Sequence, residues 1–247
     1  MRHAAPLAAL LLAACAHGPS AKEQKTAEIH HDLGLEALQK GSAPDALREF
    51  DLALAADPRM PEAHLGRGLV LEYGLGRLKE AEAAYRKAIE IRPNYSEAHN
   101  NLGQLLARNG RWAEALERFD DALASPFYRE PWVARCNKGL ALHRMGRKEE
   151  GLTELRTCLA MAPRYCAGRR ELGRLHLAEG RLKEAVEELG TYARDCEKVV
   201  DAHLQLGQAR MKAGDLPGAK ASFERCLELS MGAPSGDECR KSLELLQ

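Results

Sequence analysis

The sequence predicts an all-α protein, built as a solenoid of six stacked helical hairpins and closed by a C-terminal helix. Three observations carry this prediction. The 247 residues are 45% hydrophobic and 29% charged, which is the balance of a folded, water-exposed chain. Aromatic residues make up only 5%, and the abundant Ala, Leu, Glu, Arg and Lys favour helices packed through small side chains. A pattern of glycine, alanine and aromatic residues also recurs six times, about every 34 residues.

Residues 1–14 differ from the rest of the chain and are expected to form an export signal. Arg2 and His3 precede the apolar run Ala4–Ala14. This run is shorter than the ~20 residues that a helix needs to cross a bilayer, so it is typical of a signal peptide that is removed after export.

The signal ends in the letters LAAC, which resemble the lipobox of bacterial lipoproteins. The resemblance implies that Cys15 becomes the mature N-terminus and carries fatty acyl chains such as palmitate. Residues 15–26 are then expected to be the lipidated cysteine and a flexible tether. Because Ala16 rather than an aspartate follows the cysteine, the resemblance also implies the outer membrane, with the chain on its periplasmic face.

The repeating unit begins at a glycine that is followed by a second glycine after 7 residues, an alanine after 12 and an aromatic residue after 16. The first glycines, here called contact glycines, are Gly34, Gly68, Gly103, Gly139, Gly173 and Gly207. The second glycines, here called turn glycines, are Gly41, Gly76, Gly110, Gly146, Gly180 and Gly214. The residues at the aromatic position, here called core residues, are Phe50, Tyr85, Phe119, Leu155, Leu189 and Phe223.

Each position of the repeat has a physical reason. The contact glycine and the alanine are small, so two helices can approach closely, while the turn glycine is expected to end the first helix in the left-handed conformation. The core residue is expected to fill the gap between neighbouring hairpins, and a proline stops the second helix. The second copy carries one extra residue, in the letters EYGLGR before its turn.

These positions resemble the tetratricopeptide repeat, which implies a right-handed superhelical solenoid. The resemblance covers residues 27–231, and residues 232–247 are expected to form a capping helix over the last apolar face. The six repeats are expected at 27–60, 61–95, 96–131, 132–165, 166–199 and 200–231.

Such a scaffold leaves no room for an enzyme active site, and we expect no catalytic residue, no cofactor and no metal. Histidines recur four residues before a contact glycine, at His30, His64, His99 and His203. A metal needs ligand atoms about 2 Å from one centre, whereas equivalent positions in adjacent repeats lie about 10 Å apart. These histidines are therefore expected to pack. Lys plus Arg equal Asp plus Glu at 36 each, which disfavours nucleic acid as a partner.

Six cysteines remain after Cys15, and an even number in an exported chain suggests disulfides. Residues equidistant from the turn of a hairpin face each other, which pairs Cys136 with Cys158 and Cys166 with Cys196. The remaining pair is Cys226 with Cys239, which would hold the capping helix. A second interpretation stays open, in which cysteines such as Cys158 and Cys226 are buried small residues that replace alanine.

The first helices of stacked repeats line the inner, concave face, where a peptide or protein segment usually binds. In the first two repeats this face is apolar and presents Leu35, Leu38, Leu65, Leu69 and Tyr73. In repeats three to six it is polar and presents Asn100, Gln104, Arg108, Asn137, Arg144, Arg170, Arg174, Gln205 and Gln208. Amide side chains suit the backbone of an extended segment. The alternative is that many of these side chains only pack or face solvent.

The letters SPFYREPW add two residues between the third and the fourth contact glycine. Pro126 and Pro131 interrupt the helix there, while Phe127, Tyr128 and Trp132 are too apolar for a free loop. We expect the three aromatic residues to pack locally and the linker to fix the offset between two halves of three repeats.

The lipobox, the six repeats and this linker together resemble the outer-membrane pilotin lipoproteins of type IV pilus systems, the group of PilF, PilW and Tgl. The resemblance implies a non-enzymatic monomer that binds secretin protomers and promotes secretin assembly, and hence pilus biogenesis and pilus-dependent motility. It implies a membrane contact through the N-terminal lipid, without a small-molecule substrate. We expect Leu65, Leu69 and Tyr73 to carry the secretin contact. The alternative is a periplasmic adaptor for peptidoglycan-remodelling enzymes or other envelope complexes.

Overall fold

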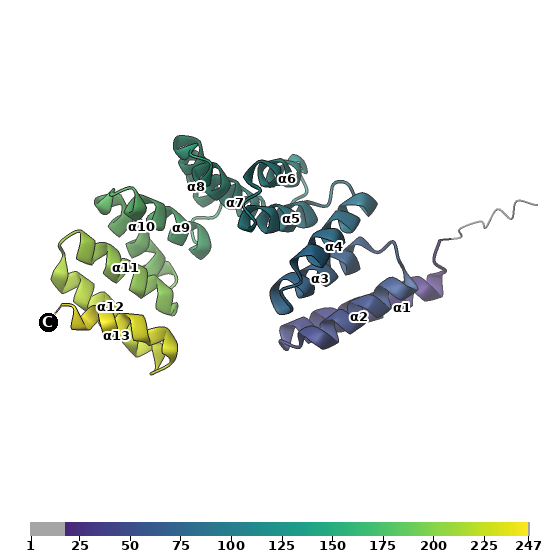
Figure 1. Ribbon diagram of the computed structural model, residues 1–247, viewed down its shortest axis with the longest axis horizontal. Helices are drawn as coiled ribbons and strands as arrows, with labels where there is room; N and C mark the ends of the chain where they lie inside the picture. Colours follow the sequence, from purple (N-terminus) through teal and green to yellow (C-terminus); the bar gives the residue numbers. More distant parts are fainter. Residues whose placement is uncertain (1–17, 247) are drawn as a thin grey trace, which may run out of the picture. The chain divides into compact units, whose positions relative to one another are not determined.

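The structure is a computed structural model that describes residues 18–246. Helices and the turns between them account for this whole range, and no strand occurs in it (Figure 1). The prediction of an all-α array of paired helices is therefore confirmed. Cys15 and the expected signal peptide lie outside the described residues. Over the range that is described, no helix combines the length and the apolar composition needed to cross a membrane.

The chain divides into two compact units, Met1–Pro93 and Asn94–Gln247. The first unit holds two hairpins, and the second holds four hairpins and the C-terminal helix. This division corrects the expectation of two halves of three repeats, because the boundary falls before the third repeat and the linker at 125–130 lies inside the second unit.

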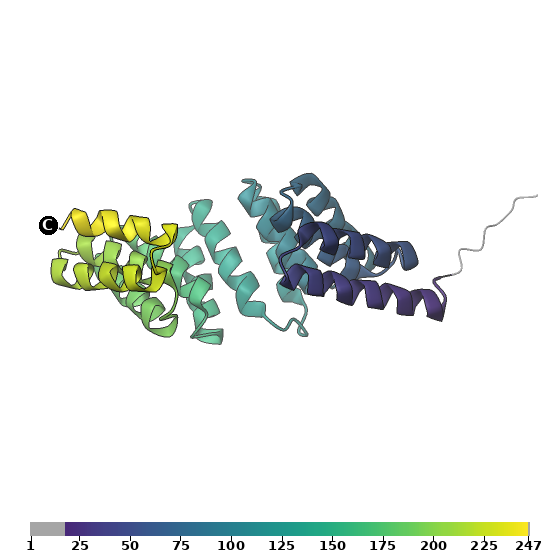
Figure 2. The ribbon, with the colours of Figure 1, turned by 90° about the horizontal axis from the view of Figure 1, so that it is seen from below.

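The first unit consists of two hairpins that lie side by side. Helix α1 (Ala21–Gln39) pairs with α2 (Ala43–Ala56), and α3 (Pro61–Leu69) pairs with α4 (Leu78–Ile91). Helix α2 packs on α3, so the two hairpins form one stack, which Figure 2 shows from below.

Helix α1 begins earlier than the sequence suggested. The Ser20 hydroxyl accepts a hydrogen bond from the Glu23 backbone N–H at 3.3 Å, and the Glu23 carboxylate accepts one from the Ser20 backbone N–H at 2.7 Å. This reciprocal capping box satisfies two backbone donors at the start of the helix. Residues 21–26, which we expected in the flexible tether, are therefore the first turns of α1.

The extra residue of the second repeat is accommodated by a π-helical turn, η1 (Val70–Gly74), between α3 and α4. The wider turn brings Glu72 into the interior, where it is only 5% exposed. Its carboxylate accepts a hydrogen bond from the hydroxyl of Tyr85 at 2.6 Å. The insertion thus places a carboxylate beside the core residue of the same hairpin.

The second unit continues the same pattern with four hairpins, in which each second helix packs on the first helix of the next hairpin. Its elements are α5 (Ser96–Arg108), α6 (Trp112–Ala124), α7 (Pro131–Arg144), α8 (Lys148–Met161), α9 (Cys166–Ala178), α10 (Leu182–Asp195), α11 (Val200–Lys212), α12 (Leu216–Ser230), the 3-10 turn η2 (Pro234–Gly236) and α13 (Asp237–Glu244).

The turn glycines have the conformation that the sequence predicts. All six have positive φ, from 67° at Gly76 to 84° at Gly146, which is the left-handed region that favours glycine. Each therefore ends the first helix of its hairpin, as expected.

The contact glycines give each hairpin room for its core residue. A Cβ added to Gly103 would lie 2.6 Å from the ring of Phe119, and all six core residues are fully buried. Phe50 also lies against Gly66 of the next hairpin, where an added Cβ would be 2.5 Å from the ring. The core residue therefore fills its own hairpin as well as the gap to the following one.

Three disulfides join the cysteines in the predicted pairs, two of which equidistance from the hairpin turns predicts and the third of which is the pair that remains. Cys136–Cys158 links α7 to α8 with a Cα–Cα distance of 5.5 Å. Cys166–Cys196 closes the α9–α10 hairpin and Cys226–Cys239 joins α12 to α13, each with a Cα–Cα distance of 6.2 Å.

The linker between α6 and α7 packs only in part. Tyr128 is 9% exposed and lies between Ala122 of α6 and Ala134 of α7, and Trp132 packs against the core of the α7–α8 hairpin. Phe127 is 88% exposed, so the expectation that it packs locally is wrong. Tyr128 already fills the space between the two helices, and the turn at 125–128 points the preceding ring to solvent.

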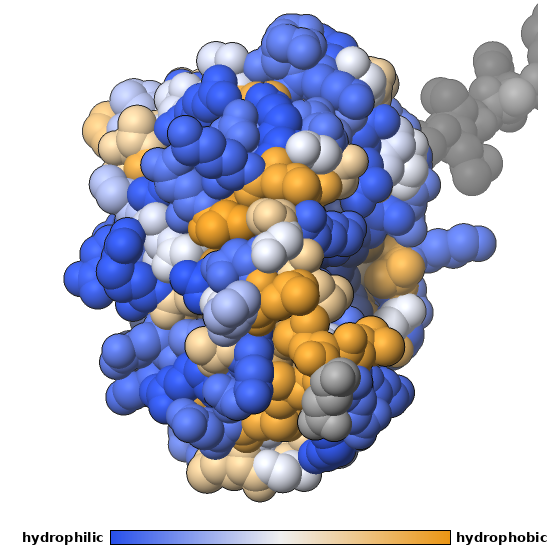
Figure 3. Space-filling model, turned by 90° about the vertical axis from the view of Figure 1, so that its left-hand side faces the viewer, coloured by the Kyte–Doolittle hydropathy of each residue, from blue (hydrophilic) through white to orange (hydrophobic). Residues whose placement is uncertain are grey.

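The C-terminal helix α13 covers part of the last hairpin. Its buried Cys239, together with Leu243 and Leu246, packs against Phe223 and Leu227 of α12. Figure 3 shows the side of the molecule that carries these helices, where apolar side chains form a broken band between charged ones. The cap therefore leaves some apolar surface in contact with solvent.

Candidate protein-binding site

The first helices of the hairpins in the first unit carry an apolar face. Here this face means Leu35 on α1, Leu65 and Leu69 on α3, and Tyr73 on η1. Tyr73 is 58% exposed and Leu35 39%, while Leu65 and Leu69 are half-buried. Helices α1 and α3, which carry three of these residues, contact each other.

Leu38 was expected to belong to the same face but lies deeper. It packs against the core around Phe50 and Val70 and is only partly exposed. Its side chain therefore stabilises the first hairpin more than it offers a surface to a partner.

The second unit carries a hollow that is lined mainly by its first helices, here called the inner groove. Its volume is about 390 Å³. Side chains from α5, α6, α7 and α9 line it, among them Gln104, Arg108, Trp112, Asn137, Leu140, Arg144, Arg170 and Glu171. Trp112 and Leu140 provide apolar contact area between amides and charges. The hollow therefore combines hydrogen-bonding groups with an apolar floor, as peptide-binding sites do.

Asn100, another expected binding residue, has a structural role instead. It is 5% exposed, and its carbonyl oxygen accepts a hydrogen bond from the Asn137 amide at 3.0 Å. This bond ties α5 to α7 across two repeats. The prediction that Asn100 faces a partner is wrong, because its hydrogen-bonding capacity is used between helices.

A second hollow of about 250 Å³ lies between α9 and α11. It is lined by Arg174, Leu177, Ala178, Gln205, Gln208 and Lys212. Three of these residues, Arg174, Gln205 and Gln208, were expected on this face. Lys212 was not expected, although it lies about one helical turn after Gln208, the last residue that was.

Two of the recurring histidines, His64 and His203, hold loops to helices. The Nε2 of His64 donates to the carbonyl of Pro58 at 3.0 Å, and the Nε2 of His203 donates to the carbonyl of Glu197 at 2.9 Å. The Nδ1 of His30 lies 2.8 Å from a glutamate carboxylate of α2. Residues 18–246 contain no group of three His, Cys, Asp or Glu side chains placed to hold a metal ion.

A sequence profile of the tetratricopeptide repeat matches residues 31–96 and 136–197, which is more than half of the chain. Two further profiles with the same description match residues 84–117 and 200–230. The matched segments include parts of all six hairpins.

Two characterised relatives resemble parts of the chain. DnaJ homolog subfamily C member 3 of Rattus norvegicus is 34% identical over 98 residues, which is 40% of this chain and 19% of that protein. The type IV pilus assembly protein PilF of Pseudomonas aeruginosa is 32% identical over 113 residues, which is 46% of this chain and 44% of PilF. The chain thus spans less than half the length of each.

Two solved structures resemble the chain over most of its length. The crystal structure of PilW, described as a widely conserved type IV pilus biogenesis factor, has a TM-score of 0.78 and 27% identity, and the match covers 88% of this chain and 98% of PilW. The structure of Pseudomonas aeruginosa PilF has a TM-score of 0.72 and 21% identity over 89% of this chain and 99% of that one, which shows a shared fold.

Proposed function

Because the chain belongs to the tetratricopeptide-repeat family, we propose that it acts by binding another protein and has no catalytic activity of its own. The partner in this proposal is the secretin of a type IV pilus system, and the chain is its pilotin. The observation that supports this best is the likeness to PilW, which extends over 88% of this chain and 98% of PilW. Because the match covers nearly the whole of both chains, it involves the number and order of the hairpins.

In this proposal Cys15 carries the lipid that holds the chain on the periplasmic face of the outer membrane. Each buried methylene contributes about 0.8 kcal/mol, so several acyl chains give a durable anchor. The anchor raises the local concentration of the binding surface where secretin protomers arrive. The three disulfides suit such a location, because disulfides persist in oxidising compartments.

The apolar face of the first unit is the proposed secretin contact. Its exposed leucine and tyrosine side chains would cover an apolar segment of a protomer until neighbouring protomers replace them. The proposed function is therefore to shield the apolar segment of a secretin protomer and to deliver the protomer to the membrane. The bound segment is released as the secretin ring forms.

The experiment that tests this proposal compares charged variants in the producing bacterium. The double substitution Leu65→Asp and Tyr73→Asp is expected to abolish heat-resistant secretin multimers and pilus-dependent motility. The control is Leu52→Asp on α2, because Leu52 is 41% exposed but lies on a second helix. Multimers that form normally in the double variant would contradict the assignment of the apolar face.

Deletion of the whole chain addresses the function itself. We expect secretin protomers to accumulate without assembling, and crosslinking to capture secretin on the wild-type protein. Capture of a peptidoglycan hydrolase or synthase, with normal secretin multimers in the deletion strain, would instead indicate an envelope adaptor.

A further inference from the structure

The first helices of the second unit carry a local excess of positive charge. Five cations, here called the basic stripe, extend from α5 to α11: Arg108, Arg144, Arg170, Arg174 and Lys212. Three of them line the inner groove, and the other two line the neighbouring hollow, which shares α9 with it. The whole chain has as many acidic as basic residues, so the excess on this surface is local.

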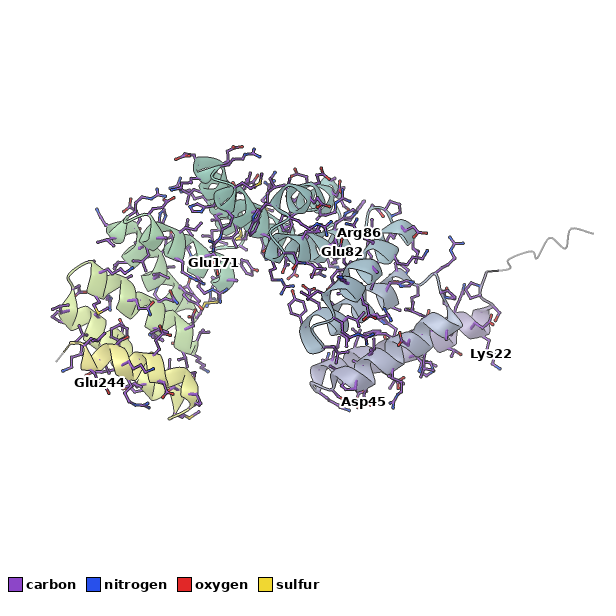
Figure 4. The ribbon with its side chains drawn as sticks, viewed as in Figure 1. Lys22, Asp45, Glu82, Arg86, Glu171 and Glu244 are labelled. Atoms are coloured by element: carbon purple, nitrogen blue, oxygen red, sulfur yellow. A yellow bond between two sulfur atoms is a disulfide. The ribbon has the colours of Figure 1, made fainter. Side chains whose placement is uncertain are left out.

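The stripe differs from other charged surfaces of the protein in how its cations are paired. On the second helices, arginines lie beside glutamates, as Arg86 does beside Glu82 at 2.7 Å on α4 (Figure 4). Among residues 18–246, no carboxylate lies within 4 Å of Arg144 or Lys212. Glu171, labelled in Figure 4, is the one acidic residue among those described that lines either hollow.

Glu171 neutralises only part of the stripe. Its carboxylate lies 2.9 Å from Arg170 and 3.8 Å from Arg174, so two arginines share one negative charge. Two more carboxylates lie nearby. Asp201 of α11 acts electrostatically on Arg170 and accepts a hydrogen bond from Gln205 at 3.2 Å, and Glu238 of α13 accepts one from Gln208 at 3.1 Å. Arg144 and Lys212, which no carboxylate of the described residues approaches within 4 Å, therefore remain available to a ligand.

The groups between the cations indicate which ligand carries the negative charge. Gln104, Asn137 and Gln205 offer amides that can bond both the N–H and the C=O groups of a peptide backbone. Trp112, Leu140 and Leu177 add apolar contact between them. A phosphate headgroup would use the cations and the amide N–H groups but neither the amide carbonyl oxygens nor the apolar groups, so the composition favours a polypeptide.

We propose that the basic stripe binds an extended, acidic polypeptide segment of a partner protein. An extended chain advances about 3.4 Å per residue, and neighbouring repeats lie about 10 Å apart, so carboxylates at every third residue meet successive repeats. A segment of about ten residues then spans the four repeats of the second unit. This contact is separate from the proposed secretin contact on the first unit, and either can hold without the other.

The experiment measures binding of a labelled ten-residue peptide, Glu-Ser-Ser three times followed by Glu, to the full chain in detergent by fluorescence anisotropy. We expect binding that weakens as salt rises, because exposed charges are screened. The same peptide with Gln in place of Glu should bind at least tenfold more weakly. The double substitution Arg144→Glu and Lys212→Glu should weaken binding of the Glu peptide at least tenfold.

The matched control is Lys183→Glu with Lys220→Glu, which makes the same charge change on the second helices α10 and α12. It should bind the Glu peptide as the wild type does. Circular dichroism confirms folding, and Arg144→Gln with Lys212→Gln replaces the reversal pair if that pair unfolds. Equal binding of the Glu and Gln peptides, equal losses in stripe and control variants, or binding of phosphatidylglycerol vesicles without binding of the peptide would overturn the proposal. If the variant with Arg144→Glu and Lys212→Glu still forms normal secretin multimers, the proposed function is not contradicted, because the proposed secretin contact lies on the first unit.

Discussion

The hairpins α7–α8 and α9–α10 differ from the other four in two ways that go together. Their core residues are Leu155 and Leu189, whereas the other hairpins have phenylalanine or tyrosine. They are also the two hairpins that contain an internal disulfide. A leucine fills less space than an aromatic ring, so these hairpins bury less apolar surface at the centre.

The difference indicates that the same repeat geometry can be stabilised either by packing of an aromatic core residue or by a disulfide bond. In α7–α8 the change is more marked, because Gly151 stands where other repeats have alanine and lies against Gly139. The two backbones approach closely, and the Cys136–Cys158 bond fixes them. The described part of the first unit has no such bond, and each of its hairpins has an aromatic core residue.

Reduction of the disulfides should produce the largest difference in stability between the two units. Each bond restricts the unfolded chain and contributes about 3 kcal/mol, so reduction should lower the free energy of unfolding of the second unit by several kcal/mol. The first unit, without a disulfide in its described residues, should be unaffected. Hydrogen exchange followed by mass spectrometry, with and without reductant, reports the units separately. Equal loss of protection in both would contradict the expectation.

Gly139→Ala tests the close approach of α7 and α8. The new Cβ would lie 2.8 Å from the backbone carbonyl of Gly151, which cannot rotate away, and the cost should be about 3 kcal/mol. The matched control is Gly190→Ala in α10, where the nearest atom is 4.0 Å away. That change should stabilise the helix by about 0.5–1 kcal/mol. Urea unfolding of both variants measures the contrast, and two variants of equal stability would refute it.

Tyr85→Phe tests the polar contact that the first unit uses near its core. The ring remains, but the buried Glu72 carboxylate loses the hydroxyl that donates to it at 2.6 Å. We expect the free energy of unfolding to fall by about 1–3 kcal/mol. Glu72→Gln in the same background should restore part of this loss, because a neutral amide is cheaper to bury than a carboxylate. A Tyr85→Phe variant as stable as the wild type would show that the contact contributes nothing.

The smallest expected effect is a pH dependence of stability that arises from His176. Burial, with Arg181 and Arg156 nearby, lowers the pKa of His176 from its ordinary value of 6.5. The unfolded chain therefore takes up a proton at this residue at a higher pH than the folded chain does. Stability of the second unit should fall as pH drops below about 6.5 and be fully present above it.

His176→Leu, which copies the residue at this position in hairpins two to four, should flatten that dependence. The measurement is the urea midpoint of the second unit between pH 7.5 and 5.5. An unchanged slope in the variant would assign the acid sensitivity of the second unit to other groups.

Much of this fold could be predicted because glycine, core residue and cysteine spacing act locally. A turn glycine is required wherever the backbone turns left-handed, and equidistance from the turn is sufficient to pair Cys136 with Cys158. These relations involve one hairpin at a time. They depend on spacing along the chain, which the sequence shows directly.

The features that sequence reasoning missed depend on contacts between elements. The extra residue near Glu72 was visible in the sequence, but the burial of the Glu72 carboxylate depends on the Tyr85 hydroxyl from α4. Phe127 is apolar and yet exposed, because apolar residues are common on surfaces and Tyr128 occupies the available space. Asn100 is polar and yet buried, because an amide of α7 satisfies it. Neighbours in space, which spacing does not reveal, decided all three.

The disulfides also govern how the chain responds to tension. They close loops with sequence separations of 22, 30 and 13 residues, all in the C-terminal half. Pulling on the two ends cannot extend these loops, which withholds roughly 220 Å of contour length at about 3.4 Å per residue. If the N-terminus is fixed and a bound partner pulls on the chain, the hairpins without disulfides would unfold and extend first. The disulfide-linked hairpins would extend less and so retain their binding surface longer.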